Sequence, residues 1–217
     1  MKIFLWIFGI VVLLLIIAGV VVGYLYMQLQ NPKQKDLNVK YTMADYDNAV
    51  KTKAKVEIPV PGNLYLGSTF TTEGSQKIDQ TFSDAEVSAI QNYSNEANGP
   101  IKNVQIHFTG NNGAEASFQT NFKYEGKEIN YPIYVKGTVS QTGPKSFSVK
   151  TSQLKAGNLT VPSFITQKAE TEFTNYVNSI LSNISSLNVE KVEINNGSVR
   201  FVGTIPTKAT GVAPLAL

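Results

Sequence analysis

The chain has 217 residues, of which 42% are hydrophobic and 16% are charged, and this balance predicts a folded protein. Nineteen basic residues against sixteen acidic residues give a formal net charge of +3, too small and too scattered to indicate a nucleic-acid-binding protein. The sequence has no cysteine and one histidine, His107, which excludes disulfides, thiolate metal sites and multi-histidine metal sites. We therefore expect a protein that is not an enzyme and has no catalytic residues, cofactor or metal.

The chain begins with a long apolar segment, residues 3–28, which carries no charge. A helix of this length extends about 39 Å, and the hydrocarbon core of a bilayer is about 30 Å thick. Trp6 lies near one end of the segment and Tyr24 and Tyr26 near the other, where aromatic rings favour the membrane interfaces. A cleaved signal peptide is the alternative, but its apolar region is normally about 7–15 residues long. The segment predicts an uncleaved single-span anchor over residues 1–28.

Two signals disagree on the orientation of this anchor. Lys2 precedes the span and Lys33, Lys35 and Lys40 follow it, so the positive-inside rule would place the body in the cytoplasm. Long domains, however, translocate largely regardless of charge, and the lack of cysteine suits an oxidising exterior. We expect a body outside the cytoplasm, on a single-pass protein of the cell membrane.

Beyond the anchor we expect a polar stalk over residues 29–40, an α+β domain over 41–206 and a tail over 207–217. Two short helices are predicted from their capping residues. A Ser-x-x-Glu box at Ser83 opens a helix to about residue 93, and a weaker box at Thr42 opens one to about residue 51.

The longest predicted helix begins near Pro162 and Ser163 and runs to Ile184. Its apolar residues keep helical spacing over about five turns, and proline in the first turn agrees with a start there. Its stripe consists of Ile165, Ala169, Phe173, Tyr176, Val177, Ile180, Leu181 and Ile184.

Alternation of apolar and polar residues predicts antiparallel strands in much of the remaining chain. These strands cover residues 63–71, 104–108, 118–124, 131–140, 145–154 and 199–205. The pairs Asn112-Gly113 and Asn196-Gly197 are predicted to turn hairpins.

A weak internal repeat is also visible, because a helix followed by a hairpin with an Asn-Asn-Gly turn occurs twice, about 85 residues apart. Two such units would bury their helix stripes around one sheet. The predicted fold is therefore α+β: an N-terminal transmembrane helix, then a curved antiparallel sheet packed on one long helix and one or two shorter ones.

Polar candidates for a site have simpler structural explanations. His107 falls on the polar face of its strand and lacks a Ser–Asp pattern beside it, so we expect a surface histidine. Asp45 and Asp47, like Asp84 and Glu86, are explained by helix capping better than by calcium binding.

Lysines 51, 53 and 55 alternate, and in an extended stretch they would share one face. Anionic lipid headgroups could bind such a face, although a solvated strand face is the simpler interpretation.

Several segments, including FSDAEVSAI, GPIKNVQIHF, YPIYVKGTV, LTVPSFITQ and GSVRFVGTIP, resemble membrane-anchored, largely uncharacterised bacterial proteins of the YpmS-like type. Those proteins are similar in layout to TULIP-like (tubular lipid-binding) domains, in which long helices lie in a curved antiparallel sheet with a lipid groove between them. The resemblance covers roughly residues 80–206. It implies an extracytoplasmic location and a hydrophobic ligand, but it transfers no functional residue.

An aromatic stripe on a helix usually packs into the hydrophobic core. The functional alternative is that the stripe of the long helix forms the wall of an apolar groove. The candidate groove residues are Phe164, Phe173, Tyr176, Val177 and Ile180. We expect a non-enzymatic protein that binds a lipid or another apolar ligand. The alternative is a cell-envelope structural or protein-interaction module with a filled core; its protein partner would be unknown.

Overall fold

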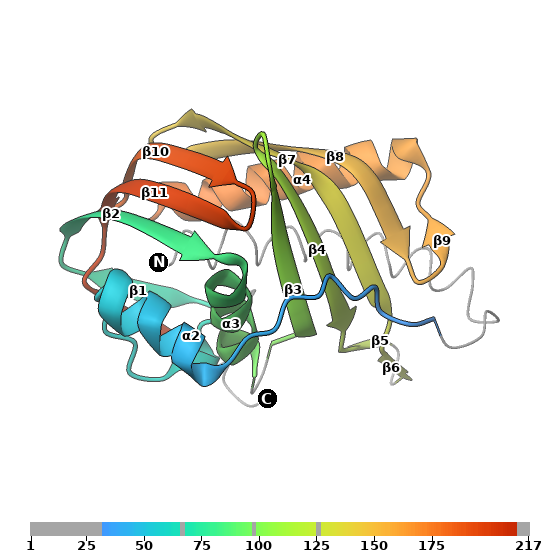
Figure 1. Cartoon of the computed structure of the whole chain (residues 1–217), viewed down its shortest axis with the longest axis horizontal. Coiled ribbons are helices and arrows are strands. Elements are labelled where there is room, and N and C mark those ends of the chain that lie inside the picture. Colours follow the sequence, from blue (N-terminus) through green and yellow to red (C-terminus); the bar gives the residue numbers. More distant parts are fainter. Residues whose placement is uncertain (1–31, 66–67, 97–98, 125–126, 212–217) are drawn as a thin grey trace.

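The computed structural model describes residues 32–65, 68–96, 99–124 and 127–211 (Figure 1). The predicted anchor over residues 1–28 lies outside these residues, as does most of the predicted tail. Within the described part the chain is α+β, its sheets are built from antiparallel strand pairs, and it has few helices. The predicted fold class is thus confirmed at this coarser level.

The largest sheet has five strands in the order β3-β4-β7-β8-β9. Four long strands form most of it, and residues near Lys136–Gly137 shift register in a bulge, which bends a strand locally. The strands are β3 (Ile101–Gly110), β4 (Gly113–Thr120), β7 (Pro132–Gly143), β8 (Ser146–Ala156) and β9 (Leu159–Thr160).

Smaller sheets complete the β structure. A three-stranded sheet has the order β10-β11-β2, and two further pairs are β1-β12 and β5-β6. These strands are β1 (Phe70–Glu73), β2 (Gln76–Ser83), β5 (Phe122–Tyr124), β6 (Lys127–Ile129), β10 (Asn188–Asn195), β11 (Ser198–Ile205) and β12 (Lys208–Gly211).

The two larger sheets meet at the turn between β10 and β11. The Gly197 amide donates to the carbonyl of Phe108 in β3 at 2.9 Å, and the Asp84 amide donates to the carbonyl of Gly197 at 3.1 Å. The Asn196-Gly197 turn was predicted correctly. The other predicted turn lies one residue earlier, at Asn111 and Asn112, both of which have positive φ.

The short helices begin at the predicted caps. Helix α2 (Met43–Asp47) follows Thr42 and continues as a π-helix, η1 (Asn48–Lys53). Helix α3 (Asp84–Asn95) follows Ser83, whose side chain and backbone exchange hydrogen bonds with Glu86 in a complete capping box. A 3-10 turn, η2 (Pro61–Asn63), precedes β1.

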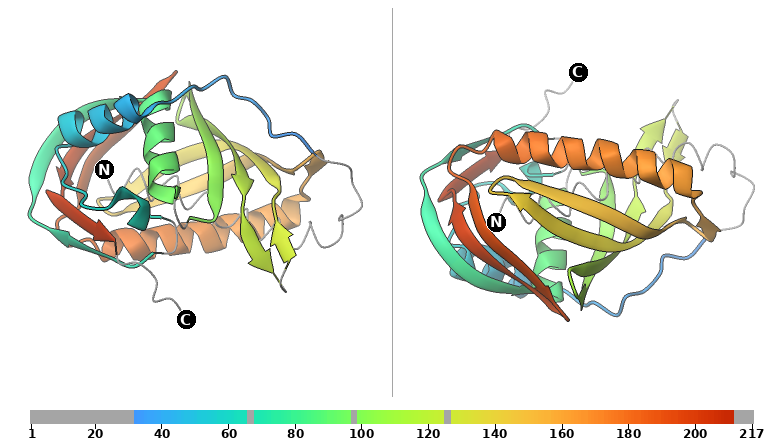
Figure 2. Two further views of the ribbon diagram at one scale, coloured as in Figure 1. Left: turned by 90° about the horizontal axis from the view of Figure 1, so that it is seen from below. Right: turned by 90° about the horizontal axis from the view of Figure 1, so that it is seen from above.

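The long helix, α4 (Ser163–Ser182), begins where it was predicted and runs beside β8 along the length of the sheet (Figure 2). Its C-terminal half buries Val177 and Leu181, and Ile184 is buried just beyond its end.

Helices α3 and α4 cover strand edges with side chains. In α3, Asp84, Ser88 and Asn92 accept hydrogen bonds from the backbone amides of Phe108, Ile106 and Val104 at 2.9 Å each. In α4, Glu170 and Asn178 accept from the amides of Thr151 and Phe147. Both helices therefore satisfy donors that an exposed strand edge would leave unpaired.

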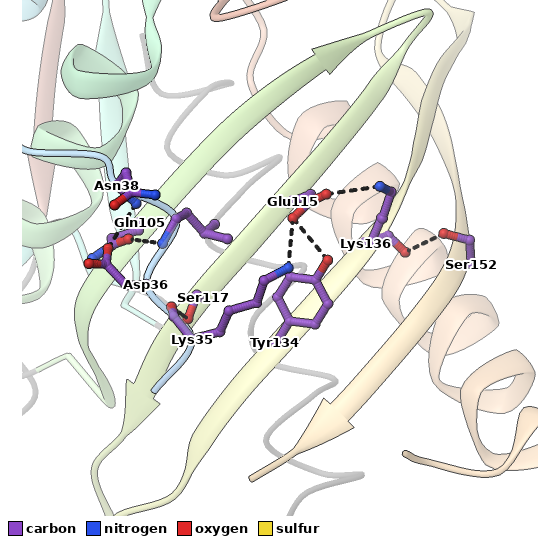
Figure 3. Close-up of polar contacts among 10 residues, drawn as sticks. Lys35, Asp36, Asn38, Gln105, Glu115, Ser117, Tyr134, Lys136 and Ser152 are labelled. Atoms are coloured by element: carbon purple, nitrogen blue, oxygen red, sulfur yellow. Dashed lines mark hydrogen bonds and ion pairs between the residues drawn. The ribbon is translucent and has the colours of Figure 1, made fainter. Parts of the chain in front are cut away.

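Residues 32–40, here called the strap, cross the polar face of the five-stranded sheet (Figure 3). Three short hydrogen bonds join the strap to β3 and β4. The Gln34 side chain donates to the Asn103 carbonyl, the Leu37 amide to Gln105 Oε1, and Ser117 Oγ to the Lys35 carbonyl, at 2.6 to 2.7 Å. The part of the predicted stalk that the structure describes is thus docked on the body.

Other sequence predictions need correction. Of the described residues in 63–71, only Phe70 and Thr71 lie in a strand, because Pro61 starts a 3-10 turn and β1 begins only at Phe70. Residues 118–124 divide between β4 and β5, which belong to different sheets. Lys51 and Lys53 lie in a π-helix, so the predicted extended lysine face is wrong.

Both units of the predicted repeat exist as elements, but they are not placed equivalently. Helix α3 packs on β3 of its own hairpin, whereas α4 packs on β8, which precedes it. The hairpins β3–β4 and β10–β11 also belong to different sheets.

Candidate functional site

Of the five positions predicted to line a groove, four share one side of α4 and Phe164 lies on the opposite side. At 3.6 residues per turn, Phe164 stands about half a turn away from Ile180, and its side chain is 72% exposed. Val177 is buried and Ile180 is half-buried. The side chains of Phe173 and Tyr176 lie outside the described part, so the α4 groove stays a prediction.

A small hollow lies on the apolar face of β4, β7 and β8. Its floor is made by small residues, Ala114, Ala116 and Gly137, and by valines around them. The cavity measures about 20 Å³, which is room for a single water molecule. It is too small to hold an acyl chain.

A larger groove lies at the α2 end of the molecule and has a volume of about 690 Å³. Ligand sites typically measure about 300–1,000 Å³ and are lined mainly by apolar side chains. The groove is bounded by α2, η1, the loop before η2 and the end of α3. It is lined by Met43, Tyr46, Asp47, Val50, Lys51, Val56, Glu57, Ile58, Pro59, Pro61, Gly62, Tyr93 and Glu96.

Backbone hydrogen bonds hold the loop that forms one wall of the groove. The Val56 amide donates to the Val50 carbonyl at 3.1 Å, which ties the loop to η1. On its other side, the Glu57 amide donates to Thr207 and the Glu57 carbonyl accepts from Ala209. Two prolines, Pro59 and Pro61, restrict the backbone further because their φ angles are fixed.

Tyr46 lies at the base of the groove, and only 2% of it is exposed. Its ring packs edge-on against Tyr93 with centroids 5.6 Å apart. Within the described part of the chain its hydroxyl has no hydrogen-bond partner. Burial and the charge of Asp47 raise the pKa of this hydroxyl, so it remains a neutral donor. A buried hydroxyl without a partner costs about 1–3 kcal/mol.

Charged side chains lie at the rim of the groove. Lys51 and Asp47 pair at 2.8 Å, and the Lys208 ammonium approaches Glu57 at 3.9 Å. Both are solvent-exposed pairs, which contribute little to stability. The groove thus combines an apolar wall with a wet, charged rim.

A buried carboxylate anchors η1, which forms part of the groove lining. Glu86 is 3% exposed and accepts hydrogen bonds from Lys53 Nζ at 2.7 Å, Asn48 Nδ2 at 2.6 Å and the Ser83 amide at 2.8 Å. These contacts fix η1 to the start of α3.

A second cleft, of about 420 Å³, lies between β8 and the start of α4. Its lining is largely polar, with Thr151, Ser152, Gln153, Thr166 and Gln167 among its residues. Its carboxylate, Glu170, is already bonded to the Thr151 amide at 2.6 Å. This cleft offers no cation or nucleophile-and-base pair in its lining.

His107 lies near the surface, where its side chain is 37% exposed. Its Nδ1 contacts Asp84 Oδ2 at 2.6 Å. Asp84 also accepts the Phe108 amide, so this contact ties β3 to the start of α3. In the described part of the chain, no cluster of three or more histidine or acidic side chains could hold a metal ion.

The sequence does not reveal this groove, because its residues come from three separate segments. Tyr46 carries no site signal of its own in the sequence, and the predicted strand over 63–71 begins only where the loop IPVPGN (58–63) ends. The two prolines in this apolar loop are the signal that could have identified a rigid wall.

No family model matches this chain, and a search of curated proteins finds no match. Among the described residues, every helix is too short or too polar to cross a membrane.

Proposed function

We propose that this chain is a single-span membrane protein whose body lies outside the cytoplasm and binds a lipid or another apolar ligand. The observation that carries the binding function is the groove around Tyr46. It has the volume of a ligand site and largely apolar walls, and one of its lining residues carries a buried hydroxyl without a partner in the described part of the chain. The anchor is supported by the length and apolar character of residues 3–28.

The groove favours a ligand with an apolar body and one hydrogen-bond acceptor. Valine, isoleucine and proline side chains offer no directional contact, so they select by shape and hydrophobicity. Because the Tyr46 hydroxyl is buried, neighbouring side chains must shift before it can donate to a carbonyl or hydroxyl oxygen of the ligand and gain the bond that it lacks in the described structure. An acyl chain with its ester or acid oxygen has this composition.

The proposed function is not enzymatic. The groove contains Asp47, Glu57 and Glu96 at its rim but neither histidine nor a hydroxyl activated by a neighbouring base. Binding rather than turnover is what this set of side chains supports.

The alternative, an interaction module with a filled core, has one observation in its favour. The hollow on the apolar face of β4 and β7 holds only about 20 Å³. A partner would then use the surface rather than the interior of the protein.

Photocrosslinking tests the groove. The full chain in nanodiscs would be incubated with a diazirine-labelled fatty acid, irradiated and mapped by mass spectrometry. We expect crosslinks in peptides covering residues 43–62. Ile58→Trp, which fills the groove, should reduce them at least fivefold, and Val60→Trp, an exposed neighbour, should leave them unchanged. Equal labelling of both variants, or labelling elsewhere only, would favour the interaction module.

The anchor is tested separately by charge. Arginine at the centre of a span costs about 2.5–3.5 kcal/mol on insertion scales. Val11→Arg with Leu14→Arg should therefore move the chain out of the membrane fraction. A mature protein that begins near Gly19 would instead identify a cleaved signal peptide.

A further inference from the structure

The described chain starts at one end of the molecule, beside the start of α4. Pro32 lies against Gly157, in the turn between β8 and β9, so closely that a Cβ atom on Gly157 would be 2.8 Å from Pro32 Cβ. Helix α4 begins three residues after β9, at the same end (Figure 1). Helix α2 and the groove lie at the opposite end.

The docked strap limits the distance between the Pro32 end of the body and the predicted membrane span. A free stalk from residue 28 to residue 40 could extend by about 43 Å. Since the strap is docked on β3 and β4, the free tether ends at Pro32 and covers only four Cα–Cα steps. Four steps extend to at most about 14 Å. The Pro32 end of the body therefore lies close to the membrane interface.

Phe164 is at this end, in the first turn of α4. Among the side chains that the structure describes, it is the most exposed large hydrophobic one, at 72%. Exposure of a full aromatic ring to water is unfavourable, and aromatic rings favour the membrane interface. Lys168, one helical turn further on, and Lys33 on the strap are also exposed, and lysines near a membrane attract anionic headgroups.

We propose that the Pro32 end of the body is a membrane-contact surface, on which Phe164 inserts among the lipid headgroups and Lys33 and Lys168 face them. This inference rests on the proposed single-span anchor. Its occupant is the surface of the same bilayer that holds the span. The body then stands on the membrane in a fixed orientation, with the groove directed away from it.

Depth-dependent fluorescence quenching tests this surface in the full chain. Because the sequence has no cysteine, single cysteines can be labelled with a bimane fluorophore at Ser163, Val60 or Leu14. The proteins would be reconstituted in phosphatidylcholine–phosphatidylglycerol vesicles that contain a lipid quencher on the headgroup or the upper acyl chain. Ser163 is exposed and leaves Phe164 intact, and Val60, 53% exposed, is the matched position at the other end.

We expect quenching of the Ser163 label at least threefold stronger than that of the Val60 label. Phe164→Ser in the Ser163-labelled chain should reduce it by half or more, and Lys168→Gln should weaken its dependence on phosphatidylglycerol. If the Leu14 label is quenched but the Ser163 and Val60 labels are quenched weakly and equally, the proposed membrane-contact surface is wrong. Absence of quenching at Leu14 would instead overturn the anchor itself.

Discussion

Asn92 of α3 and Asn178 of α4 make the same pair of hydrogen bonds to two different strands of the five-stranded sheet. Asn92 accepts the Val104 amide at 2.9 Å and donates to the Val104 carbonyl at 2.7 Å. Asn178 accepts the Phe147 amide at 2.9 Å and donates to the Phe147 carbonyl at 3.1 Å. Each carboxamide thus pairs with a strand as a neighbouring strand would, and two helices close edges that could otherwise pair with another chain.

Replacing either asparagine should therefore open the strand that it covers. Asn92→Ala leaves the Val104 amide and carbonyl without these bonds, at a cost of about 1–3 kcal/mol. Hydrogen exchange at the Val104 amide should accelerate, and Asn178→Ala should do the same at Phe147. Asn175→Ala, on the exposed side of α4, is the control and should change neither amide. If the Val104 and Phe147 amides remained protected from exchange in these variants, the asparagine carboxamides would not be the groups that close the two strand edges.

The Lys53–Glu86 pair and the Lys51–Asp47 pair should differ sharply in their contributions to stability. Lys53→Met leaves the carboxylate of Glu86, whose side chain is 4% exposed, without its ammonium partner. Loss of one partner of a buried pair is strongly destabilising, and since Lys53 is itself partly exposed we expect about 2 kcal/mol. Lys51→Met removes an exposed i,i+4 pair and should cost less than about 0.5 kcal/mol. Chemical denaturation in detergent micelles measures both; equal costs would contradict the buried role of Glu86.

Glu115 should make the stability of the protein depend on pH in the acid range. Burial raises the pKa of this carboxyl, but hydrogen bonds from Lys136, Tyr134 and Lys35 outweigh burial and lower the pKa to about 2 (Figure 3). A depressed pKa in the folded state stabilises the protein above the ordinary value of 4.5, and this stabilisation is lost as the pH falls from there toward 2.

The comparison with Glu115→Gln isolates this effect. At pH 7 the variant should be less stable by about 2 kcal/mol, the range of hydrogen bonds to a charged group. The difference should shrink steadily between pH 5 and pH 2, in denaturation curves recorded across that range (about one curve per pH unit). A constant difference would show that the charge of Glu115 is not responsible. Glu172→Gln, an exposed carboxylate on α4, is the control.

Local chemistry explains which parts of the fold were predictable from the sequence. Ser83 and Thr42 carry their capping signals within four residues, and both helices begin there. The long helix was predictable from its periodic stripe. The strand β2 was not, because the polar residues Gln76 and Gln80 share the less exposed face with Ile78 and Phe82 and so break the alternation; β2 is held by its register with β11.

The candidate site could not be predicted from the sequence, because it is formed by contacts between segments that lie far apart in the chain. Tyr46 and Ile58 belong to different segments and come together only because the loop before η2 is bonded to Thr207 and Ala209, 150 residues later in the chain. The aromatic stripe of α4 was locally visible, but periodicity cannot tell whether a residue such as Phe164 faces a core, a ligand or a membrane.

Tyr46→Phe should have opposite effects on stability and on ligand binding. The substitution removes a buried hydroxyl that has no partner in the described part of the chain and keeps the ring on Tyr93. Removing an unsatisfied polar atom from an apolar site should stabilise the ligand-free protein by about 1 kcal/mol. If the hydroxyl donates to the ligand, the same change should reduce fatty-acid crosslinking at residues 43–62 by severalfold. Tyr41→Phe, on a half-buried ring beside the same cluster, should change both measurements little. A variant that is more stable and binds as well as the original chain would show that the ligand does not use this hydroxyl. A variant that is less stable would show that the hydroxyl already has a partner in the folded protein.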